Sequence, residues 1–439
     1  MAIWVYRLAA LLSPQHVQVR LILGQLHQEN QSWNAAETCF HQVLNLEPRH
    51  YQATCQLGIL ANAQQKYAEA LPYLSITQAE NPPCQGAEQA MYVRHYRDAL
   101  HNQSLPKDTP RILVLRHPYC QTNFYQIVLD WAKLNCPEIL YHFELRILPC
   151  ETHTWPEVSL HIPWLQDPVQ QWSTKAYAKA QAIAEQCRSR NIPIINPVDK
   201  LLNATKLAGS CRIAQAGLRT PKMVAITNLS QFKQDLGNLK LPLFIREDWG
   251  HGGKITQLDT EDEVSTLTLE GFVRPIAVER VDAQSKDGLY RKYRYIVAGQ
   301  RGISHHLMIT PNWITRGEDR LFTEETRAEE LAYIQAPDPN HSRFQAALEK
   351  LELDFVAFDY GYDKNGDVIV WEANPFPFIH FSGPDGLLLY RQTAIHRTLA
   401  AMLALYLERA GLAVPEPIRV LLSEDPSTIQ SELDQLQRP

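Results

Sequence analysis

The chain has 439 residues, more than a single hydrophobic core usually serves, so two or three domains are expected. Hydrophobic residues make up 45% and charged residues 21% of it, close to the average of ordinary globular proteins. The formal net charge of −6 is small for this length and gives no electrostatic basis for a nucleic-acid platform, so we expect no nucleic-acid partner.

The first twelve residues are apolar, carry only Arg7 as a charge and lack a small-residue cleavage site, which predicts a first helix rather than a signal peptide. No run approaches the ~20 apolar residues that a membrane span needs, so no membrane partner is expected. The eight cysteines are widely spaced without a CxxC pair or metal-ligand spacing. They are interpreted as small buried hydrophobic residues of a reducing compartment, which favours a cytoplasmic location.

Residues 17–50 and 51–84 form a repeat. The matched pairs are Leu23 with Leu57, Gly24 with Gly58, Ala36 with Ala70, and Pro48 with Pro82. This spacing and its small residues are typical of tetratricopeptide repeats, in which two helices pack closely where side chains are small. Phe40 and Leu74 fill the adjacent large position, and the prolines end the second helices. Two repeats need neighbours to bury their faces, so a capping helix is expected over about 85–101.

After a polar linker over 102–110, strands and helices alternate. Strands are expected at 111–116, about 140–148 and 193–197, with helices at 123–134 and 174–190, as in a small layer built on a parallel sheet. Further along we expect a helix over 204–216 and strands at 243–247, 255–258, 276–280 and 293–297. A long helix over about 391–409 and a mobile polar tail over 411–439 complete the chain.

Residues 250–254, Gly-His-Gly-Gly-Lys, lie between two predicted strands. The glycines Gly250, Gly252 and Gly253 would let backbone amides approach an anion closely, and Lys254 adds a positive charge. When such a segment stands alone, a flexible turn is the more common explanation. It is not a Walker motif, because the GK[ST] ending is absent.

A predicted hairpin over 358–375 carries the strongest signal. An Asn365-Gly366 pair favours a two-residue type I′ turn, and the register of such a turn places Asp359 opposite Glu372. Asn374 leaves the same strand face as Glu372. Two carboxylates and an amide suit Mg²⁺. An exposed hairpin with a polar face is the alternative, although the flanking residues read as buried. Together with the glycine loop, this site is what an enzyme that uses a nucleoside triphosphate needs.

Histidines and one arginine are further candidates for substrate contacts. His305 and His306 follow the strand at 293–297, where neighbouring residues point to opposite faces, so one would face substrate while the other packs. A structural role for both histidines is the more common arrangement and is the interpretation that we favour. Arg316 could reach phosphate or lie at the surface. His117 follows the first apolar strand, at the sheet edge where α/β folds bind ligands.

The ordered series of motifs resembles the ATP-grasp superfamily, in its glutathione-synthetase-like and protein-glutamate-ligase-like branch. The resemblance rests on 203–206, Gly217 with 220–221, 242–246, 250–254, 277–281, 293–299, 358–359 and 372–375, and it covers roughly residues 111 to 410. It implies a small α/β layer followed by two lobes that clamp ATP. The expected domains are a helical repeat domain over 1–104, an α/β domain over 110–200, lobes over 201–280 and 281–410, and the tail.

The resemblance also implies roles for single residues. Lys206 and Arg246 would contact phosphate, although a lysine is usual at the second position and arginine differs in reach. Glu279 would accept a hydrogen bond from the adenine amino group, with the Arg280–Val281 backbone at the hinge of the lobes. Arg294 would face the transferred phosphoryl group. The acid that usually holds the ribose is missing near Lys292, and Asp282 or Asp287 would have to replace it.

The implied activity is a carboxylate–amine ligase that uses ATP with Mg²⁺ or Mn²⁺, forms an acyl phosphate and releases ADP. No nucleophilic Ser or Cys is expected, because positioning and charge stabilisation carry the rate. The repeats favour a peptide or protein as substrate or separate partner, while a small amino acid stays open. A small-molecule kinase and a non-catalytic nucleotide-binding adaptor are the alternatives. The resemblance also makes a homodimer an option.

Overall fold

The computed structural model describes residues 2–64, 66–78, 109–116, 123–148, 158–165, 169–236, 238–249, 254–313, 315, 317–381 and 386–423. Two compact units emerge from the backbone contacts. The first contains 1–133 and 137–194, and the second contains 134–136 and 195–439. The predicted capping helix over 85–101 lies outside the described residues.

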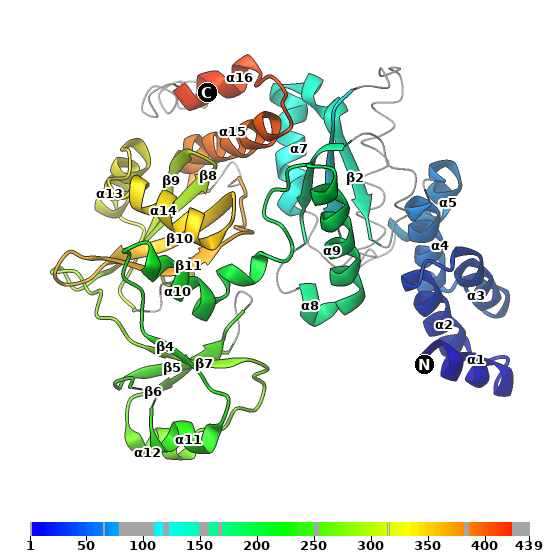
Figure 1. Cartoon of the computed structure of the whole chain (residues 1–439), viewed down its shortest axis with the longest axis horizontal. Helices are drawn as coiled ribbons and strands as arrows, with labels where there is room; N and C mark the ends of the chain where they lie inside the picture. The colour runs from blue at the N-terminus through cyan, green and yellow to red at the C-terminus, as the bar shows by residue number, and fades with distance from the viewer. Residues whose placement is uncertain are drawn as a thin grey trace. The chain divides into compact units, whose positions relative to one another are not determined.

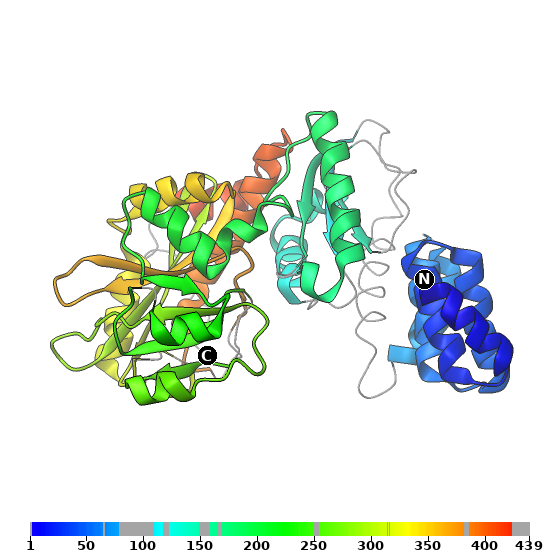
Figure 2. The ribbon, with the colours of Figure 1, turned by 60° about the horizontal axis from the view of Figure 1, so that its bottom comes forward.

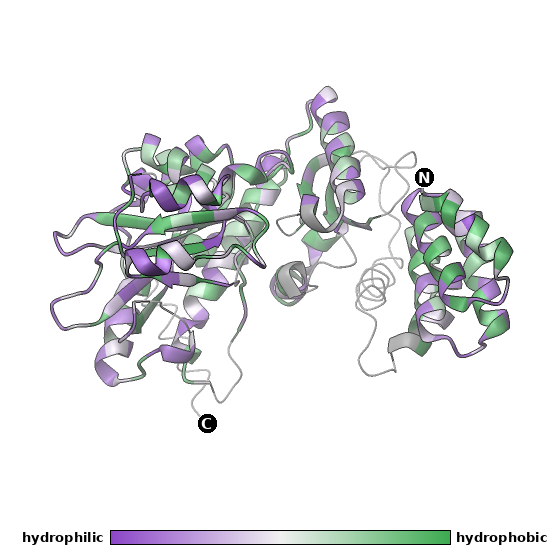
Figure 3. Cartoon of the chain, turned by 90° about the horizontal axis from the view of Figure 1, so that it is seen from below, coloured by the Kyte–Doolittle hydropathy of each residue, from purple (hydrophilic) through white to green (hydrophobic). Residues whose placement is uncertain are grey.

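The N-terminal part of the first unit is helical, as expected. It contains α1 (Ala2–Leu12), α2 (Val17–Glu29), α3 (Trp33–Leu46), α4 (Tyr51–Ala63) and α5 (Tyr67–Gln78). These helices pack in sequence order, with apolar and polar residues alternating along each (Figures 2 and 3). A Cβ atom on Gly24 would overlap the ring of Phe40, and one on Gly58 would overlap Leu74, so the small and large positions of both pairs pack together.

The rest of the first unit is built on a three-stranded parallel sheet in the order β2-β1-β3. Its elements are β1 (Arg111–Arg116), α7 (Asn123–Asn135), η1 (Pro137–His142), β2 (Phe143–Ile147), β3 (Val158–Pro163), α8 (Val169–Trp172) and α9 (Thr174–Ser189). The strand predicted at 193–197 is wrong. Pro193 and Pro197 have no N–H to donate, and only a single bridge joins Ile194 to His161.

The second unit begins with a four-stranded antiparallel sheet in the order β4-β7-β5-β6 (Figure 1). Its elements are η2 (Leu201–Ala204), α10 (Lys206–Gln215), β4 (Met223–Ala225), α11 (Leu229–Gln234), β5 (Leu243–Glu247), β6 (Thr256–Leu258), α12 (Glu261–Thr266) and β7 (Pro275–Glu279). Apolar residues of β5 and β6 such as Leu243, Ile245 and Leu258 pack against α11 and α12 in one core.

A second antiparallel sheet follows in the order β11-β10-β8-β9. Its elements are β8 (Tyr290–Ala298), β9 (Arg301–Thr310), η3 (Gly317–Asp319), α13 (Glu324–Gln335), α14 (His341–Leu351), β10 (Phe355–Tyr362), β11 (Val368–Asn374), η4 (Leu389–Arg391) and α15 (Gln392–Arg409). Asn196 fixes the start of β10, because its side-chain oxygen accepts from Phe355 N at 3.1 Å and its amide donates to Phe355 O at 2.7 Å.

Two sequence predictions need correction here. The segment predicted as a mobile tail begins with a helix, α16 (Glu416–Ser423), whose Ile418 is fully buried beside α15. The cysteines are also not uniform, because Cys211 is exposed and Cys55 is disulfide-bonded, whereas Cys39, Cys136 and Cys187 are buried thiols outside any disulfide. Within the described residues, no helix is both long and apolar enough to cross a membrane.

Candidate functional site

A cavity of about 620 Å³ is lined by residues of both antiparallel sheets of the second unit. Strands β5 and β7 supply one wall, β8, β10 and β11 supply the other, and the start of α10 closes one end. The predicted site residues that line it are Lys206, Arg246, Glu279, Arg280, Val281, Asp359 and Glu372. Residues far apart in the sequence therefore meet around one space.

The cationic end of the cavity is held in place by Asp248, which follows β5. Its backbone oxygen accepts from Lys206 N and its side chain accepts from Leu207 N, both at 2.8 Å. The same carboxylate accepts a hydrogen bond from Arg274 Nη2 at 2.9 Å. These bonds tie the first turn of α10 to the end of β5, so the buried Lys206 and the half-buried Arg246 line the same cavity. Burial lowers the pKa of Arg246, and the charge of Glu372 opposes that shift.

The opposite end of the cavity combines an acid with aromatic rings. Oε2 of Glu279 is buried and accepts no hydrogen bond within the described part of the chain, although Lys222 Nζ lies 4.0 Å away, so it can accept from an N–H donor of a ligand. Phe244 and Trp313 stack with their ring centroids 4.7 Å apart. Arg280 lies over Trp313 at 5.4 Å and donates to Tyr290 Oη at 3.3 Å. This end of the cavity suits a flat heteroaromatic group with an exocyclic amine.

The hairpin that carries the acids differs from its prediction in its loop and in its strand pairing, and the two differences shift the register in opposite directions. The loop has three residues instead of two, because Gly366 N donates to Asp363 O at 2.9 Å and Gly366 is the only residue of this loop with a positive φ, of 85°. This shifts the pairing by one residue. A bulge at Trp371 then shifts it back, so that Asp359 still pairs with Glu372 as predicted. The bulge places both Trp371 and Glu372 on the cavity.

The three predicted metal ligands lie on adjacent strands. Asp359 on β10 and Asn374 on β11 are buried, and Glu372 lines the cavity beside Asp359. Asn374 Oδ1 accepts from Phe376 N at 2.8 Å. No cluster of three His, Cys, Asp or Glu side chains suited to a metal occurs in the described ranges, so this candidate depends on two carboxylates and one amide.

Asp359 is already engaged by a cation. Arg294 Nε and Nη2 donate to its two oxygens at 2.7 and 2.8 Å, and Lys292 Nζ lies 3.8 Å away. Burial is the largest single influence and lowers the pKa of Arg294, but the charge of Asp359, its hydrogen bonds and the charge of Glu372 together outweigh it, so the pKa is raised. Arg294 therefore stays a fixed cation bound to Asp359, but it is not itself among the residues that line the cavity.

These side chains belong to a transverse row across the sheet, which we define as Glu372, Asp359, Arg294 and His306. Each is the direct partner of the next in the order β11-β10-β8-β9. Direct partners in antiparallel strands share one face, with strands ~4.8 Å apart. The row thus runs from two carboxylates through a guanidinium to an imidazole on one face of the sheet.

The histidine pair departs from the predicted strand geometry. His305 is the extra residue of a bulge in β9, because Arg294 pairs with His306 and Tyr295 with Ser304. Both rings are therefore buried together, with their Nδ1 atoms 2.8 Å apart, instead of pointing to opposite faces. Burial lowers the pKa of His305 to about 3 and that of His306 well below its usual value, and Arg294 adds to both shifts. Both imidazoles are neutral at pH 7.

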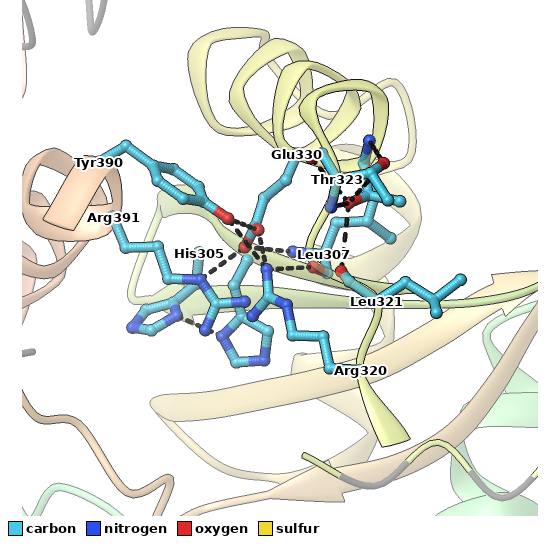
Figure 4. A network of polar contacts seen from close by, with 10 residues as sticks. His305, Leu307, Arg320, Leu321, Thr323, Glu330, Tyr390 and Arg391 are labelled. Atoms are coloured by element: carbon cyan, nitrogen blue, oxygen red, sulfur yellow. Dashed lines mark hydrogen bonds and ion pairs between the residues drawn. The ribbon is translucent and has the colours of Figure 1, made fainter. Parts of the chain in front are cut away.

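A buried ionic network, the Glu330 cluster, lies next to this pair (Figure 4). It consists of Glu330 on α13, Arg320 before α13, and Tyr390 and Arg391 of η4. Glu330 is fully buried and accepts from Arg391 Nε at 2.6 Å, from Leu307 N at 3.2 Å, and from Arg320 and Tyr390. The cluster joins β9, α13 and η4 and supports the His306 end of the transverse row.

Other candidates lie elsewhere. Lys254 Nζ donates to Glu270 O at 3.3 Å and lies over Phe272 instead of lining the cavity. Asp287 is held by Arg291 at 3.0 and 2.8 Å, whose hydrogen bonds lower its pKa to about 2, and neither it nor Asp282 lines the cavity. Gly250, Gly252, Gly253, Arg316 and His117 lie outside the described residues.

Sequence reasoning missed Asp248, Trp313 and the Glu330 cluster. Asp248 carries a weak signal, because an acid directly after a strand can cap a helix elsewhere in the fold. Trp313 had none beyond its aromatic character. Glu330 lies in a segment with charges at its neighbours Glu329 and Arg327, which reads as an exposed helix face.

No protein-family model and no curated protein matches the chain. Solved structures do, at low identity. The ATP-grasp ligase PsnB in complex with precursor peptide PsnA2 and AMPPNP is 12% identical, with a TM-score of 0.45, over 69% of this chain and 99% of that one. The D-Ala:D-Ser ligase VanG from Enterococcus faecalis is 14% identical, with a TM-score of 0.40, over 68% and 99%.

A third similar structure is the RiPP-associated ATP-grasp ligase from Chryseobacterium gregarium, in complex with ADP and a leader and core peptide. It is 12% identical, with a TM-score of 0.43, over 68% of this chain and 97% of that one. At these identities and TM-scores the similarities do not assign the chain to a family.

Proposed function

We propose that the chain is an ATP- and Mg²⁺-dependent ligase that joins a carboxylate to an amine through an acyl phosphate and releases ADP. The observation that carries this proposal is a single cavity lined by Lys206 of α10 and Arg246 of β5, by the carboxylates Asp359 and Glu372 of the second sheet, and by Glu279 of β7. That arrangement suits a nucleoside triphosphate, which has a heteroaromatic base at one end and a polyanion with its divalent ion at the other.

Different residues along the cavity would bind different parts of ATP. Glu279 would accept a hydrogen bond from the adenine amino group, and the Phe244–Trp313 pair would contact the adenine ring. Lys206 and Arg246 would bind phosphate oxygens. Arg294 would stabilise charge on the phosphoryl group as it moves to the carboxylate, because it is fixed by Asp359 and need not reorganise.

A divalent cation fits the acidic end of the row. Asp359, Glu372 and Asn374 offer only oxygen donors, which Mg²⁺ and Mn²⁺ prefer, and these three residues would hold it. When bound, such an ion neutralises phosphate charge.

The helical arm supports a peptide or protein as substrate or partner. We infer that 17–50 and 51–84 are tetratricopeptide repeats, since the Gly24–Phe40 and Gly58–Leu74 contacts recur at matching positions. Concave arrays of this kind commonly bind extended chains.

A non-catalytic adaptor is the second candidate. It is favoured by Arg246 at a position where the resemblance leads us to expect lysine, and by the absence of Asp282 and Asp287 from the cavity lining. Turnover separates the two functions, because an adaptor binds nucleotide without consuming it.

The test compares wild type with Glu372→Gln, which keeps the shape of the side chain and removes a predicted metal ligand. ADP release is measured with Mg²⁺ over a panel of amino acids and peptides, and products are analysed by mass spectrometry. We expect substrate-dependent ADP release with an amide product in wild type, and a loss of at least about 10²-fold in Glu372→Gln.

Glu349→Gln is the matched control, because Glu349 is exposed on α14 and does not line the cavity. It should turn over like wild type. Background ADP release that is equal in all three proteins, with nucleotide binding retained, would favour the adaptor. A phosphoester in place of an amide would identify a kinase.

A further inference from the structure

Lys292 of β8 is a cation of the cavity that has no assigned role in the proposed function. Its side chain is 23% exposed and lines the same space as Asp359 and Glu372. Its ammonium group lies 3.8 Å from Asp359 Oδ2 and donates a hydrogen bond to Thr315 O at 3.3 Å. An ammonium group carries three N–H donors, so Lys292 can still donate to a ligand in the cavity.

Strand geometry explains why Lys292 lies beside the acids. Lys292 and Arg294 are two residues apart on β8, so their side chains leave the same face of the sheet. On that face Arg294 is the direct partner of Asp359 and donates to both of its oxygens. Lys292 reaches the same carboxylate without a hydrogen bond to it, because 3.8 Å is too long for one. Its ammonium group is therefore held near Asp359 but not bound to it.

These contacts balance the acidic end of the cavity before any metal ion binds. Among the described residues, the carboxylates there are Asp359 and Glu372, and the cations beside them are Arg294 and Lys292. Positive and negative charges at this end are therefore equal in number. Any divalent ion added here needs the negative charge of a bound ligand to offset it.

The rest of the cavity is matched to a triphosphate with one divalent ion. A triphosphate brings about four negative charges, and one divalent ion offsets about two of them. Lys206 and Arg246, which line the cavity, offset the remainder, while Glu279 and Arg280 cancel each other. A second divalent ion would leave a surplus of about two positive charges in a site partly withheld from water, which is costly.

We propose that the Lys292 ammonium group takes the place of a second divalent ion, so that the chain binds its nucleotide with one Mg²⁺. This inference rests on the proposed ligase function, in which Asp359, Glu372 and Asn374 hold that single ion. Some enzymes that transfer phosphoryl groups use two metal ions at the phosphates. In this chain Lys292 donates to a phosphate oxygen directly, as a compact charge on a flexible stem.

The first measurement counts the ions that wild type binds. Mn²⁺, which prefers the same oxygen ligands as Mg²⁺, is titrated into the full chain with one equivalent of AMPPNP, and free Mn²⁺ is followed by electron paramagnetic resonance. We expect one Mn²⁺ ion for each AMPPNP bound. Two ions for each nucleotide would overturn the inference.

The second measurement removes the charge of Lys292. Lys292→Gln keeps a polar side chain but has no ammonium group. In calorimetry with saturating Mg²⁺ it should bind AMPPNP about tenfold more weakly than wild type, the effect expected from one charge-assisted contact. Its affinity for adenosine should be unchanged, because adenosine has no phosphate. An equal loss of affinity for both ligands would indicate a structural role for Lys292 and contradict the inference.

Lys286→Gln is the matched control, because Lys286 is exposed in the turn before β8 and does not line the cavity. It should bind both ligands as wild type does. If Lys292→Gln binds AMPPNP as tightly as wild type, the inference is wrong. If Lys292→Gln does not fold, the ion count on wild type decides.

The same titrations separate this inference from the proposed function. If AMPPNP binds and Glu372 is needed for turnover but two ions are bound, only the role of Lys292 is wrong. If wild type binds no AMPPNP, the ligase proposal and the role of Lys292 both fail.

Discussion

The Glu330 cluster makes a sharp prediction about stability, because two adjacent glutamates on α13 differ in burial. Glu330 is fully buried between Arg320 and Arg391, whereas the side chain of Glu329 is 37% exposed and bonds Arg291 at 2.6 Å. Glu330→Gln keeps the shape of the side chain but removes its charge. Two buried guanidiniums would then lack a counter-charge, which costs about 3 to 5 kcal/mol of unfolding free energy.

Glu329→Gln is the control for the same chemical change at the surface. Arg291 keeps Asp287 as a partner, and an exposed pair contributes at most about 1 kcal/mol. Both variants are compared with wild type by urea unfolding, followed by circular dichroism and tryptophan fluorescence. AMPPNP binding serves as a check of folding, because neither residue lines the cavity. Equal small losses in both variants would refute the reasoning and mean that the buried carboxyl is not needed as a charge.

Three further predictions concern other parts of the chain. Gly361→Ala should cost about 1 to 3 kcal/mol in urea unfolding, since its Cβ would overlap the Trp371 ring, and Gly317→Ala, which has open space, should cost far less. Burial lowers the pKa of His161 to about 4, so the unfolded chain binds its proton more tightly and stability of the first unit should fall between about pH 6.5 and pH 4, by roughly 3 kcal/mol. If the stability of His161→Phe falls over the same pH range as steeply as that of wild type, this prediction is contradicted. Trp313→Ala should weaken ATP binding about tenfold in calorimetry through loss of the aromatic wall, whereas Trp4→Ala on exposed α1 should have no effect.

Local patterns were enough for most of the strands and helices and for two of the acids. Asp359 and Glu372 were named from the hairpin pattern, whereas Lys206, Arg246 and Glu279 were named from the resemblance to the ATP-grasp superfamily, and all five line one space. The hairpin carried its part of that information because a divalent metal ion needs oxygen donors that lie close together. The roles of these residues remain predictions.

The hairpin shows where local reasoning reaches its limit. Asp359 does face Glu372, but a three-residue loop and a bulge at Trp371 produce that pairing together, not the predicted two-residue turn. The bulge depends on Gly361 of the neighbouring strand, whose missing Cβ leaves room for the indole. The Asn365-Gly366 pair in the sequence gives no information about the space next to Gly361.

The sequence by itself determined which residue types the chain could bring to a site and the alternation that builds its strands and helices. Only the tertiary structure decided the bulge that buries His305 beside His306, and the contacts that gather Arg320, Glu330 and Arg391. The physical reason is the distance along the sequence over which each effect acts. Alternation and helical periodicity follow from backbone geometry within a few residues. A buried charge is tolerated only when distant segments supply its partners, and that supply is fixed by packing of the whole unit.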